Sequence, residues 1–367
     1  MSSAPGRLAT ATRGSSLLAE IAAGIDSVVL RGARAIIDRT IMPDPAEAES
    51  LRASAAFYTG SPFDCEPRRF FAFLDDGPAA AVVEVEPLGD ARCGASREGL
   101  RFESRYAPVN PDHLAVHQAA IANHVAHAER WYHAGARDHP TIVALHGFGT
   151  GYPSIDATAL MASDFYAAGF DVILFTLPLH GRRTPEGVRL SGRAFASTDV
   201  AEINEALGQA VHDISALVRW VRHHSGRPLG LVGISLGGYV ASLMAGLSDE
   251  LDFVIPIIAP VCFGDLAHRF MAASTRYRSR PAALAREEFQ AAYRVHSPLT
   301  YELRLSPDRA LIVAGLGDRI VPAEHPQWLW AHWGEPGIYW FAGSHVAPFG
   351  RKKVFAEIRA FLARLGL

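Results

Sequence analysis

Residues 229–243 of the sequence read LGLVGISLGGYVASL, with glycines two places before and two places after Ser235. The apolar run before this serine predicts a strand, and the run after it predicts a helix. A chain that turns so sharply from strand to helix brings positions 233 and 237 together, and only a very small residue tolerates that approach. Gly233 and Gly237 therefore predict a tight elbow. It projects the Ser235 hydroxyl at a helix N-terminus, where negative charge is favoured.

Five other short apolar runs accompany the strand before Ser235. They read TIVAL (141–145), DVILFTLPL (171–179), DFVIPIIAP (252–260), RALIVAG (309–315) and GIYWFAG (337–343). Continuous apolar runs of this length are typical of strands buried on both faces of a parallel sheet. Apolar residues at helical spacing follow over 199–225, and again from Val354 to Leu365. The pattern predicts an α/β fold with a mostly parallel central sheet flanked by helices.

A serine hydroxyl is a good nucleophile only when a base accepts its proton. His345 follows the last apolar run and Asp318 follows the run before it. Both therefore lie at the carboxyl ends of predicted strands, where parallel sheets place their chemistry. We expect His345 to act as the base for Ser235 and Asp318 to orient the imidazole. Asp265, after the run over 252–260, is an alternative acid, and a turn aspartate at 318 and a surface histidine at 345 are the non-catalytic interpretations.

Attack by a serine on an acyl carbon creates an oxyanion that needs hydrogen-bond donors already in place. We expect one donor to be the backbone N–H of Leu236, directly after the serine. The second is expected to be the backbone N–H of Phe148, in the turn after the run over 141–145. His146 and Gly147 are expected to shape this turn and to take no part in the chemistry.

Four motifs, LHGFG, GISLGG, GDRIVP and GSHVAP, resemble those of the α/β-hydrolase superfamily over roughly residues 100–367. The order Ser, Asp, His along the chain is the order that this fold uses. RPLGLVGISLGGYVASL, the GRR after LPLH and the long N-terminal extension are similar to the branch called α/β-hydrolase domain-containing protein eighteen. The superfamily implies esterases, lipases, thioesterases and peptidases, and a minority of non-catalytic members. The HG motif continues as FGTGYPS and not as HGGG, which argues against the hormone-sensitive-lipase type.

The chain is predicted to consist of an N-terminal extension (1–98) and an α/β-hydrolase domain (99–367). This domain is expected to begin with antiparallel strands in 100–108 and 124–135, although the alanines and histidines of the second stretch also suit a helix. Helical patterns over about 261–307 predict a cap insertion over the site. The aromatic residues of this cap are expected to form its own core, and an acyl pocket is the alternative use for them. They are Phe263, Phe270, Tyr277, Phe289 and Tyr293.

The extension contains an amphipathic pattern over residues 16–41, with Leu17, Ile21, Ile25 and Val28 or Val29 on one face, continuing through Ala33 and Ile36. We expect a helix that packs with this face on the body of the protein. The alternative is peripheral contact with a membrane surface through the same helix.

Composition narrows the classes of partner. The net charge of −3 gives no reason to expect a nucleic acid. Cys65, Cys93 and Cys262 are too few and too scattered for a disulfide framework, which fits a reducing, cytoplasmic compartment. No apolar run is long enough to span a membrane as a helix.

No cofactor is predicted, because the chain has no phosphate-binding loop and no dinucleotide fingerprint. His113 and His117 have i,i+4 spacing, and His124 and His127 follow, but no clustered cysteine or carboxylate joins them, so no metal site is predicted either. Arg182 and Arg183 follow a predicted strand, and we expect them in a solvated loop or an ion pair. The alternative is that they bind an anionic group of the substrate.

The sequence thus predicts a cofactor-independent serine hydrolase that cleaves a small carboxylic ester through an acyl-enzyme intermediate. The alternatives are a thioesterase, a lipase-like enzyme or a peptidase with the same three side chains, or a hydrolase fold that only binds. Activity is expected to fall at acid pH, because a protonated imidazole cannot accept the serine proton.

Overall fold

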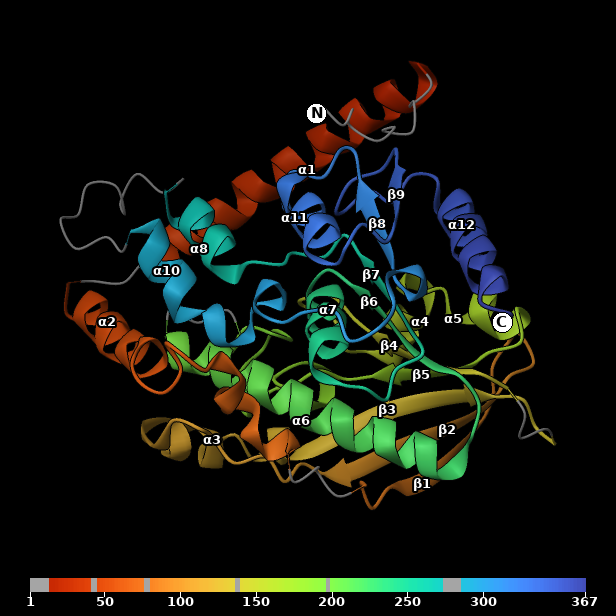
Figure 1. The fold of residues 1–367 in the computed structure, drawn as a ribbon, viewed down its shortest axis with the longest axis horizontal. Coiled ribbons are helices and arrows are strands. Elements are labelled where there is room, and N and C mark those ends of the chain that lie inside the picture. Colours follow the sequence, from red (N-terminus) through yellow and green to blue (C-terminus); the bar gives the residue numbers. More distant parts are fainter. Residues whose placement is uncertain (1–12, 41–44, 76–79, 136–138, 196–198, 273–284) are drawn as a thin grey trace.

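The computed structural model describes residues 13–40, 45–75, 80–135, 139–195, 199–272 and 285–367. A nine-stranded sheet runs through the molecule in the order β1-β2-β3-β5-β4-β6-β7-β8-β9 (Figure 1). Its strands are β1 (Glu84–Asp90), β2 (Ser96–Glu103), β3 (Val125–Tyr132), β4 (Thr141–Leu145), β5 (Asp171–Phe175), β6 (Leu229–Ile234), β7 (Phe253–Ile257), β8 (Leu311–Gly315) and β9 (Gly337–Phe341).

The six strands predicted as parallel are parallel neighbours, from β5 through β4, β6, β7 and β8 to β9. The two strands predicted as antiparallel, β2 and β3, pair with each other, and β3 joins the parallel part through β5. The predicted α/β-hydrolase type of fold, with a mostly parallel sheet, is confirmed.

Helices cover both faces of the sheet because successive side chains of a strand point to opposite sides. Val143 and Leu145 of β4 face one apolar cluster, and Ile142 and Ala144 face the other. The first cluster includes residues of α6 (Val200–His224), α7 (Leu236–Leu247) and α11 (Glu324–His332). The second includes residues of α4 (Pro153–Ala159), α5 (Ala162–Ala167) and α12 (Arg351–Arg364).

The remaining elements are α1 (Arg13–Thr40), α2 (Pro45–Thr59), α3 (Leu114–Ala119), α8 (Phe263–Ala272) and α10 (Arg286–Ala292). Short 3₁₀ turns are η1 (Pro67–Leu74), η2 (Pro111–His113), η3 (Ile121–His124), η4 (Gly181–Arg183), η5 (Arg294–His296), η6 (Pro298–Thr300) and η7 (Pro307–Arg309).

The sheet begins before the boundary predicted at residue 98. The first strand, β1, lies wholly within the predicted extension, and β2 crosses the boundary. The extension is also bound to the rest of the chain further upstream, because Tyr58 of α2 donates a hydrogen bond to the buried Glu205 of α6 at 2.7 Å. The described residues of the range 45–98 thus pair with the sheet through β1 and contact α6 through α2.

The amphipathic helix of the extension is present as α1 and packs on the body, but through a different face from the one predicted. Ala22, Ala23, Asp26 and Leu30 are buried. The large apolar residues of the predicted face are exposed, namely Leu17, Ile21, Ile25, Val28 and Val29. The side chains of Ala33 and Ile36 lie outside the described residues. Close contact with neighbouring loops selects small residues, which is why alanines and not leucines are buried. Contact with a membrane surface stays a prediction.

The described part of the insertion over 261–307 contains α8, α10, η5 and η6, and residues 301–306 are not helical. Phe289 and Tyr293 are buried and Phe263 is half-buried, but all three pack in the apolar cluster that includes residues of α6 and α7, so they do not form a separate core of the insertion. The side chain of Phe270, and all of Tyr277, lie outside the described residues. Among the described helices, none is both long enough and apolar enough to cross a bilayer.

Candidate active site

Ser235 stands at the turn between β6 and α7, in a backbone conformation that few residues other than glycine adopt, with φ 54° and ψ −114°. A Cβ at Gly233 would lie 2.6 Å from the Gly238 nitrogen, and one at Gly237 would lie 2.7 Å from the His146 carbonyl oxygen. Both distances are shorter than real Cβ contacts, so the backbone of the elbow closes only with glycine at these positions. The turn holds Ser235 at the carboxyl end of the central strands.

Ser235, His345 and Asp318 are joined by hydrogen bonds. The Ser235 Oγ lies 2.8 Å from His345 Nε2, and His345 Nδ1 lies 2.9 Å from Asp318 Oδ2. A carboxylate only accepts hydrogen bonds, so Nδ1 carries the ring proton and Nε2 turns its lone pair toward the serine. The three residues come from the loops after β6, β8 and β9. Along the chain, Ser235 is 110 positions from His345, and Asp318 is 27 positions from His345.

Asp318 is held by its own turn. Its Oδ1 accepts the backbone N–H groups of Ile320 at 2.9 Å and Val321 at 2.7 Å, which leaves Oδ2 for the imidazole. The side chain of Asp318 is only 4% exposed and that of His345 only 12%, so the pair is shielded from water. Shielding strengthens the bond between them relative to an exposed pair.

Asp265, the alternative acid, does not contact His345. It forms ion pairs with Arg269 and Arg286, and it lies 3.2 Å from His325 Nε2. Burial alone would raise the pKa of Asp265, but the hydrogen bonds from Arg269 and His325 outweigh it and hold the pKa below the usual range. Asp265 therefore anchors the start of α8, and Asp318 is the carboxylate that meets the imidazole.

His146 shapes the turn after β4, as the sequence predicts. Its Nε2 accepts the backbone N–H of Leu177 at 3.0 Å, so Nδ1 is the protonated nitrogen and donates to the Gly147 carbonyl at 2.8 Å. Burial lowers the pKa of His146 to about 3, which keeps the ring neutral. Gly147 abuts the elbow, because a Cβ there would lie 3.6 Å from the Ser235 Cβ. The backbone of Phe148 follows directly in the same turn.

Arg182 and Arg183 have different environments. Arg182 is exposed, whereas Arg183 is fully buried in an ion pair with Asp213 of α6 at 2.7 Å. Arg183 also donates to the carbonyls of Thr176 and Asn123. The predicted ion pair is thus present at Arg183, which ties the segment after β5 to α6 and is not directed at a substrate.

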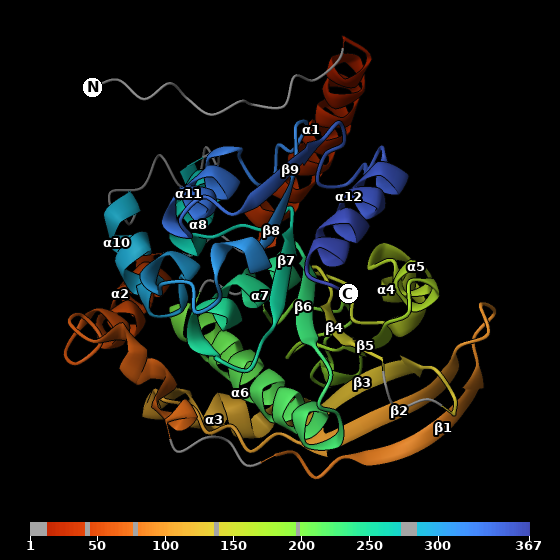
Figure 2. The ribbon, with the colours of Figure 1, turned by 45° about the vertical axis from the view of Figure 1, so that its right-hand side comes forward.

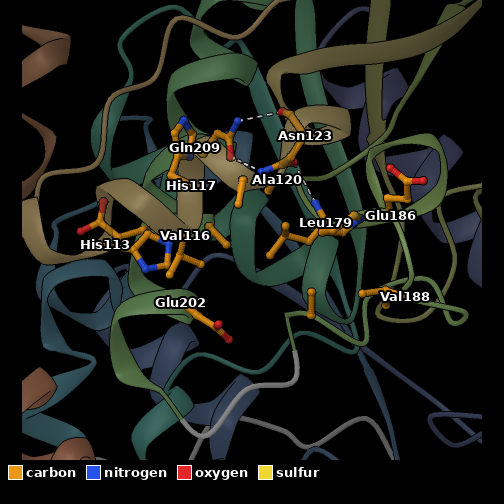
Figure 3. Close-up of a pocket in the computed structure, with 15 residues that line it drawn as sticks. His113, Val116, His117, Ala120, Asn123, Leu179, Glu186, Val188, Glu202 and Gln209 are labelled. Atoms are coloured by element: carbon orange, nitrogen blue, oxygen red, sulfur yellow. Dashed lines mark hydrogen bonds between the residues drawn. The ribbon is translucent and has the colours of Figure 1, made fainter.

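A cavity of about 310 Å³ lies away from the serine, between residues 113–123, α6 and the segment after β5 (Figure 3). His113 and His117, whose spacing raised the question of a metal, line it. In this cavity the Asn123 side chain donates to Gln209 Oε1 at 2.5 Å and accepts the backbone N–H of Leu179 at 3.0 Å. Within the part of the chain that the structure describes, no group of three or more histidines, cysteines or carboxylates could hold a metal ion.

One residue at the site was missed by the sequence analysis. Asp26 of α1 is fully buried and accepts hydrogen bonds from the backbone N–H groups of Arg319, which follows Asp318, and of His345 and Val346. The available signal was an acidic residue among the small and apolar positions Ala22, Ala23 and Leu30, all one helical turn away. A buried carboxylate must find donors, so such a residue points to a specific partner.

Comparisons with known proteins place the chain among α/β hydrolases. A family model described as "Alpha/beta hydrolase domain containing 18" matches residues 83–265. Two uncharacterised proteins of Mycobacterium tuberculosis, from strains CDC 1551 and H37Rv, are each 30% identical to it over 326 residues. The 326 aligned residues cover 87% of this chain and 76% of the length of each relative.

Two solved structures share the fold. Acetyl xylan esterase 1 from Thermoanaerobacterium sp. JW/SL YS485 is similar with a TM-score of 0.58 and 16% identity, over 87% of this chain and 98% of that one. An acetyl xylan esterase from Paenibacillus sp. R4 gives a TM-score of 0.56 and 14% identity, over 79% and 93%. At such low identity these two likenesses show the fold alone.

Proposed function

This chain belongs to the alpha/beta hydrolase domain containing 18 family, and on that premise we propose that it is a serine hydrolase that cleaves a carboxylic ester. The observation that carries the proposal is the hydrogen-bonded series from Ser235 Oγ through His345 to Asp318. It places a hydroxyl, an imidazole lone pair and an orienting carboxylate in the order that acyl transfer requires.

In the proposed reaction the Ser235 oxygen attacks the acyl carbon while its proton passes to His345 Nε2. The imidazolium then gives that proton to the departing alcohol, which leaves the acyl group on the serine. Water attacks this acyl-enzyme while its proton passes to Nε2. The bond between the acyl carbon and the Ser235 oxygen then breaks, the imidazolium returns the proton to that oxygen, and the carboxylic acid departs. Asp318 stays ionised throughout, holds the Nδ1 tautomer and stabilises the imidazolium.

The oxyanion would be bound by the backbone N–H groups of Leu236 and Phe148. Leu236 is the first residue of α7, and the first N–H groups of a helix have no acceptor within it. The turn that carries Phe148 is held beside Ser235 by His146 and Gly147. Donors fixed in this way need no rearrangement when charge develops on the substrate oxygen.

Support for an ester as the substrate comes from the fold relatives, since both solved structures named above are acetyl xylan esterases. Thioesters, lipid esters and peptides react by the same steps and are the alternatives. The predicted cytoplasmic location is part of the proposal, because Cys65, Cys93 and Cys262 are all free thiols.

The proposal is tested by Ser235→Ala with p-nitrophenyl acetate as substrate. Removing the nucleophile is expected to lower kcat by about 10⁴-fold or more and to abolish labelling by a fluorophosphonate probe. The matched control is Ser242→Ala in α7, where the hydroxyl only donates to the Gly238 carbonyl. If the parent protein neither hydrolyses the substrate nor reacts with the probe, the fold serves only for binding. If Ser235→Ala still hydrolyses the substrate, Ser235 is not the nucleophile.

A panel of substrates then separates the alternatives. We expect short-chain p-nitrophenyl esters to be cleaved with a higher kcat/KM than thioesters or peptides that carry the same acyl group. If a thioester or a peptide is preferred by about tenfold or more, the ester proposal is wrong although the three side chains are right.

A further inference from the structure

Asp26 lies on the buried face of α1 and is fully enclosed. Its carboxylate accepts four hydrogen bonds. Oδ1 receives the Ser344 hydroxyl at 2.7 Å and the Val346 N–H at 3.0 Å. Oδ2 receives the backbone N–H groups of His345 and Arg319, each at 3.0 Å. Both oxygens of this carboxylate are thus fully used by the main chain and one hydroxyl.

The donors belong to the two loops that complete the candidate active site. Arg319 directly follows Asp318, and Ser344 and Val346 stand on either side of His345. A single carboxylate therefore joins the loop of the acid to the loop of the base. Hydrogen bonds to an ionised acceptor are shorter and stronger than neutral ones, and burial shields this carboxylate from the solvent that would weaken them.

The helix backbone also fits closely against the Asp318 loop. A Cβ at Gly317 would lie 3.1 Å from the Ala23 nitrogen and 3.2 Å from the Ala22 Cβ. The two loops are themselves connected, since the Gly317 N–H donates to the Gly343 carbonyl at 2.9 Å. Figures 1 and 2 show α1 passing beside β8 and β9, the strands from which these loops emerge. Asp26 therefore lies where α1, the loop after β8 and the loop after β9 meet.

We propose that Asp26 is a positioning residue, through which the N-terminal helix holds the His345 imidazole between Ser235 and Asp318. The inference rests on the proposed function. Asp26 binds the main chain of His345 itself, so its loss frees the backbone from which the imidazole projects. A shift of the base by about 1 Å can cost about 10²-fold in rate. On this view α1 supports the catalytic side chains through the single buried carboxylate of Asp26.

The test compares Asp26→Ala and Asp26→Asn with Glu20→Gln in the full-length protein. Glu20 is an exposed acid on the same helix and is the matched control. Asp26→Asn keeps the volume of the side chain but replaces one carboxylate oxygen by an NH₂ group. The two donors that face this NH₂ group then lose their acceptor. If Asp26→Ala does not fold, Ser344→Ala replaces it, because it removes a single donor to the carboxylate.

We expect kcat for p-nitrophenyl acetate to fall by about 10- to 100-fold in Asp26→Ala, with KM changed by less than about threefold. The kcat of Asp26→Asn should fall by a similar or smaller factor, and that of Ser344→Ala by about fivefold. The kcat of Glu20→Gln should not change. Rates are measured at a temperature where every variant is folded by circular dichroism. Folded variants of Asp26 that keep kcat within about threefold of the parent would overturn the proposal.

A spectroscopic measurement separates this proposal from the proposed function. The Nδ1 proton of His345, bonded to Asp318, should give a low-field NMR signal in the Ser235→Ala background, where no turnover is possible. We expect Asp26→Ala to shift or broaden that signal and Glu20→Gln to leave it unchanged. An unchanged signal overturns the positioning role even if the protein hydrolyses esters. If the parent protein does not hydrolyse esters but Asp26→Ala still changes the signal, the hydrolase function is wrong and the positioning role of Asp26 stands.

Discussion

At the scale of single residues, the site depends on a strained serine and on glycines that allow the strain. Ser235 has a positive φ, which costs of the order of 1–3 kcal/mol and persists only where the surroundings enforce it. The enforcement comes from close backbone contacts at Gly233 and Gly237, which a side chain would prevent. The free energy spent on this turn is offset elsewhere by the burial of β6 and α7.

Gly233→Ala tests this dependence. The added methyl group collides with the backbone of Gly237 and Gly238, so the elbow must open. We expect the free energy of unfolding to fall by at least about 2 kcal/mol and ester turnover to be lost. Urea denaturation and the p-nitrophenyl acetate assay measure the two effects.

The matched control for this substitution is Gly226→Ala, just before β6, where an added Cβ meets nothing within 4 Å. It should change the free energy of unfolding by less than about 0.5 kcal/mol. Equal behaviour of the two variants would show that the elbow can relax, which would contradict the crowding described here.

At the scale of elements, ion pairs and carboxylates join segments that apolar packing alone would leave apart. The buried pair of Arg183 and Asp213 joins the segment after β5 to α6. Burial alone would raise the pKa of Asp213, but the Arg183 guanidinium together with the contacts of His212 and Ser104 outweighs burial and holds the pKa below the usual range. Asp213 also accepts the Ser104 hydroxyl, which connects the end of β2 to the same point.

Arg183→Ala should therefore destabilise the protein far more than Arg182→Ala. It leaves the Asp213 carboxylate buried without its cation, which costs about 3–5 kcal/mol in comparable pairs. The neighbouring exposed Arg182 should contribute less than about 0.5 kcal/mol. Urea midpoints at pH 7 give both values, and a loss of similar size in the two variants would refute a special role for the buried pair.

At the scale of the whole molecule, several buried histidines must stay neutral for the fold to close. Burial lowers the pKa of His146 to about 3, that of His296 to about 3 and that of His180 to about 4. The His296 ring is enclosed by hydrogen-bond partners. Its Nε2 lies 2.9 Å from the side-chain oxygen Oδ1 of Asn204, and its Nδ1 lies 2.6 Å from the Tyr239 hydroxyl. The Tyr239 hydroxyl also lies 3.0 Å from the His296 carbonyl oxygen.

The stability of the protein should fall as the pH is lowered from about 6.5 to 5. Above pH ~6.5 these rings are neutral in both the folded and unfolded states, so they contribute no pH dependence. Below it the unfolded chain takes up protons that the folded rings refuse, at about 1.4 kcal/mol per pH unit for each group. Burial raises the pKa of Asp156 to about 6, so protonation of this carboxyl favours the folded state as the pH falls. This single group opposes the three histidines named above.

Urea denaturation at pH 7.0, 6.0 and 5.0 measures this slope. His296→Gln should reduce the slope by about one proton, and His223→Gln, at an exposed position, should leave it unchanged. A free energy of unfolding that stays constant between pH 7 and 5 would mean that these rings are protonated in the folded state.

Most of the architecture follows from local sequence. Each apolar run predicted as a parallel strand is one, because burial on both faces of a sheet demands continuous apolar residues, as in 141–145. The elbow glycines follow from sterics, and the placing of Asp318 and His345 after β8 and β9 follows from the rule that parallel strands end at one edge. The face of α1 was predicted wrongly, because periodicity finds the apolar side of a helix but not the neighbour it meets.

The sequence by itself determined the type of sheet, the strand-to-helix turn at Ser235 and the candidate acid and base, since all of these depend on residues near in the chain. Only the tertiary structure decided that Asp318 and not Asp265 meets His345, and that Asp26 from α1 binds both loops. The physical reason is distance along the chain. Asp26 and His345 are 319 positions apart, and no local preference records which buried donors a distant carboxylate will find.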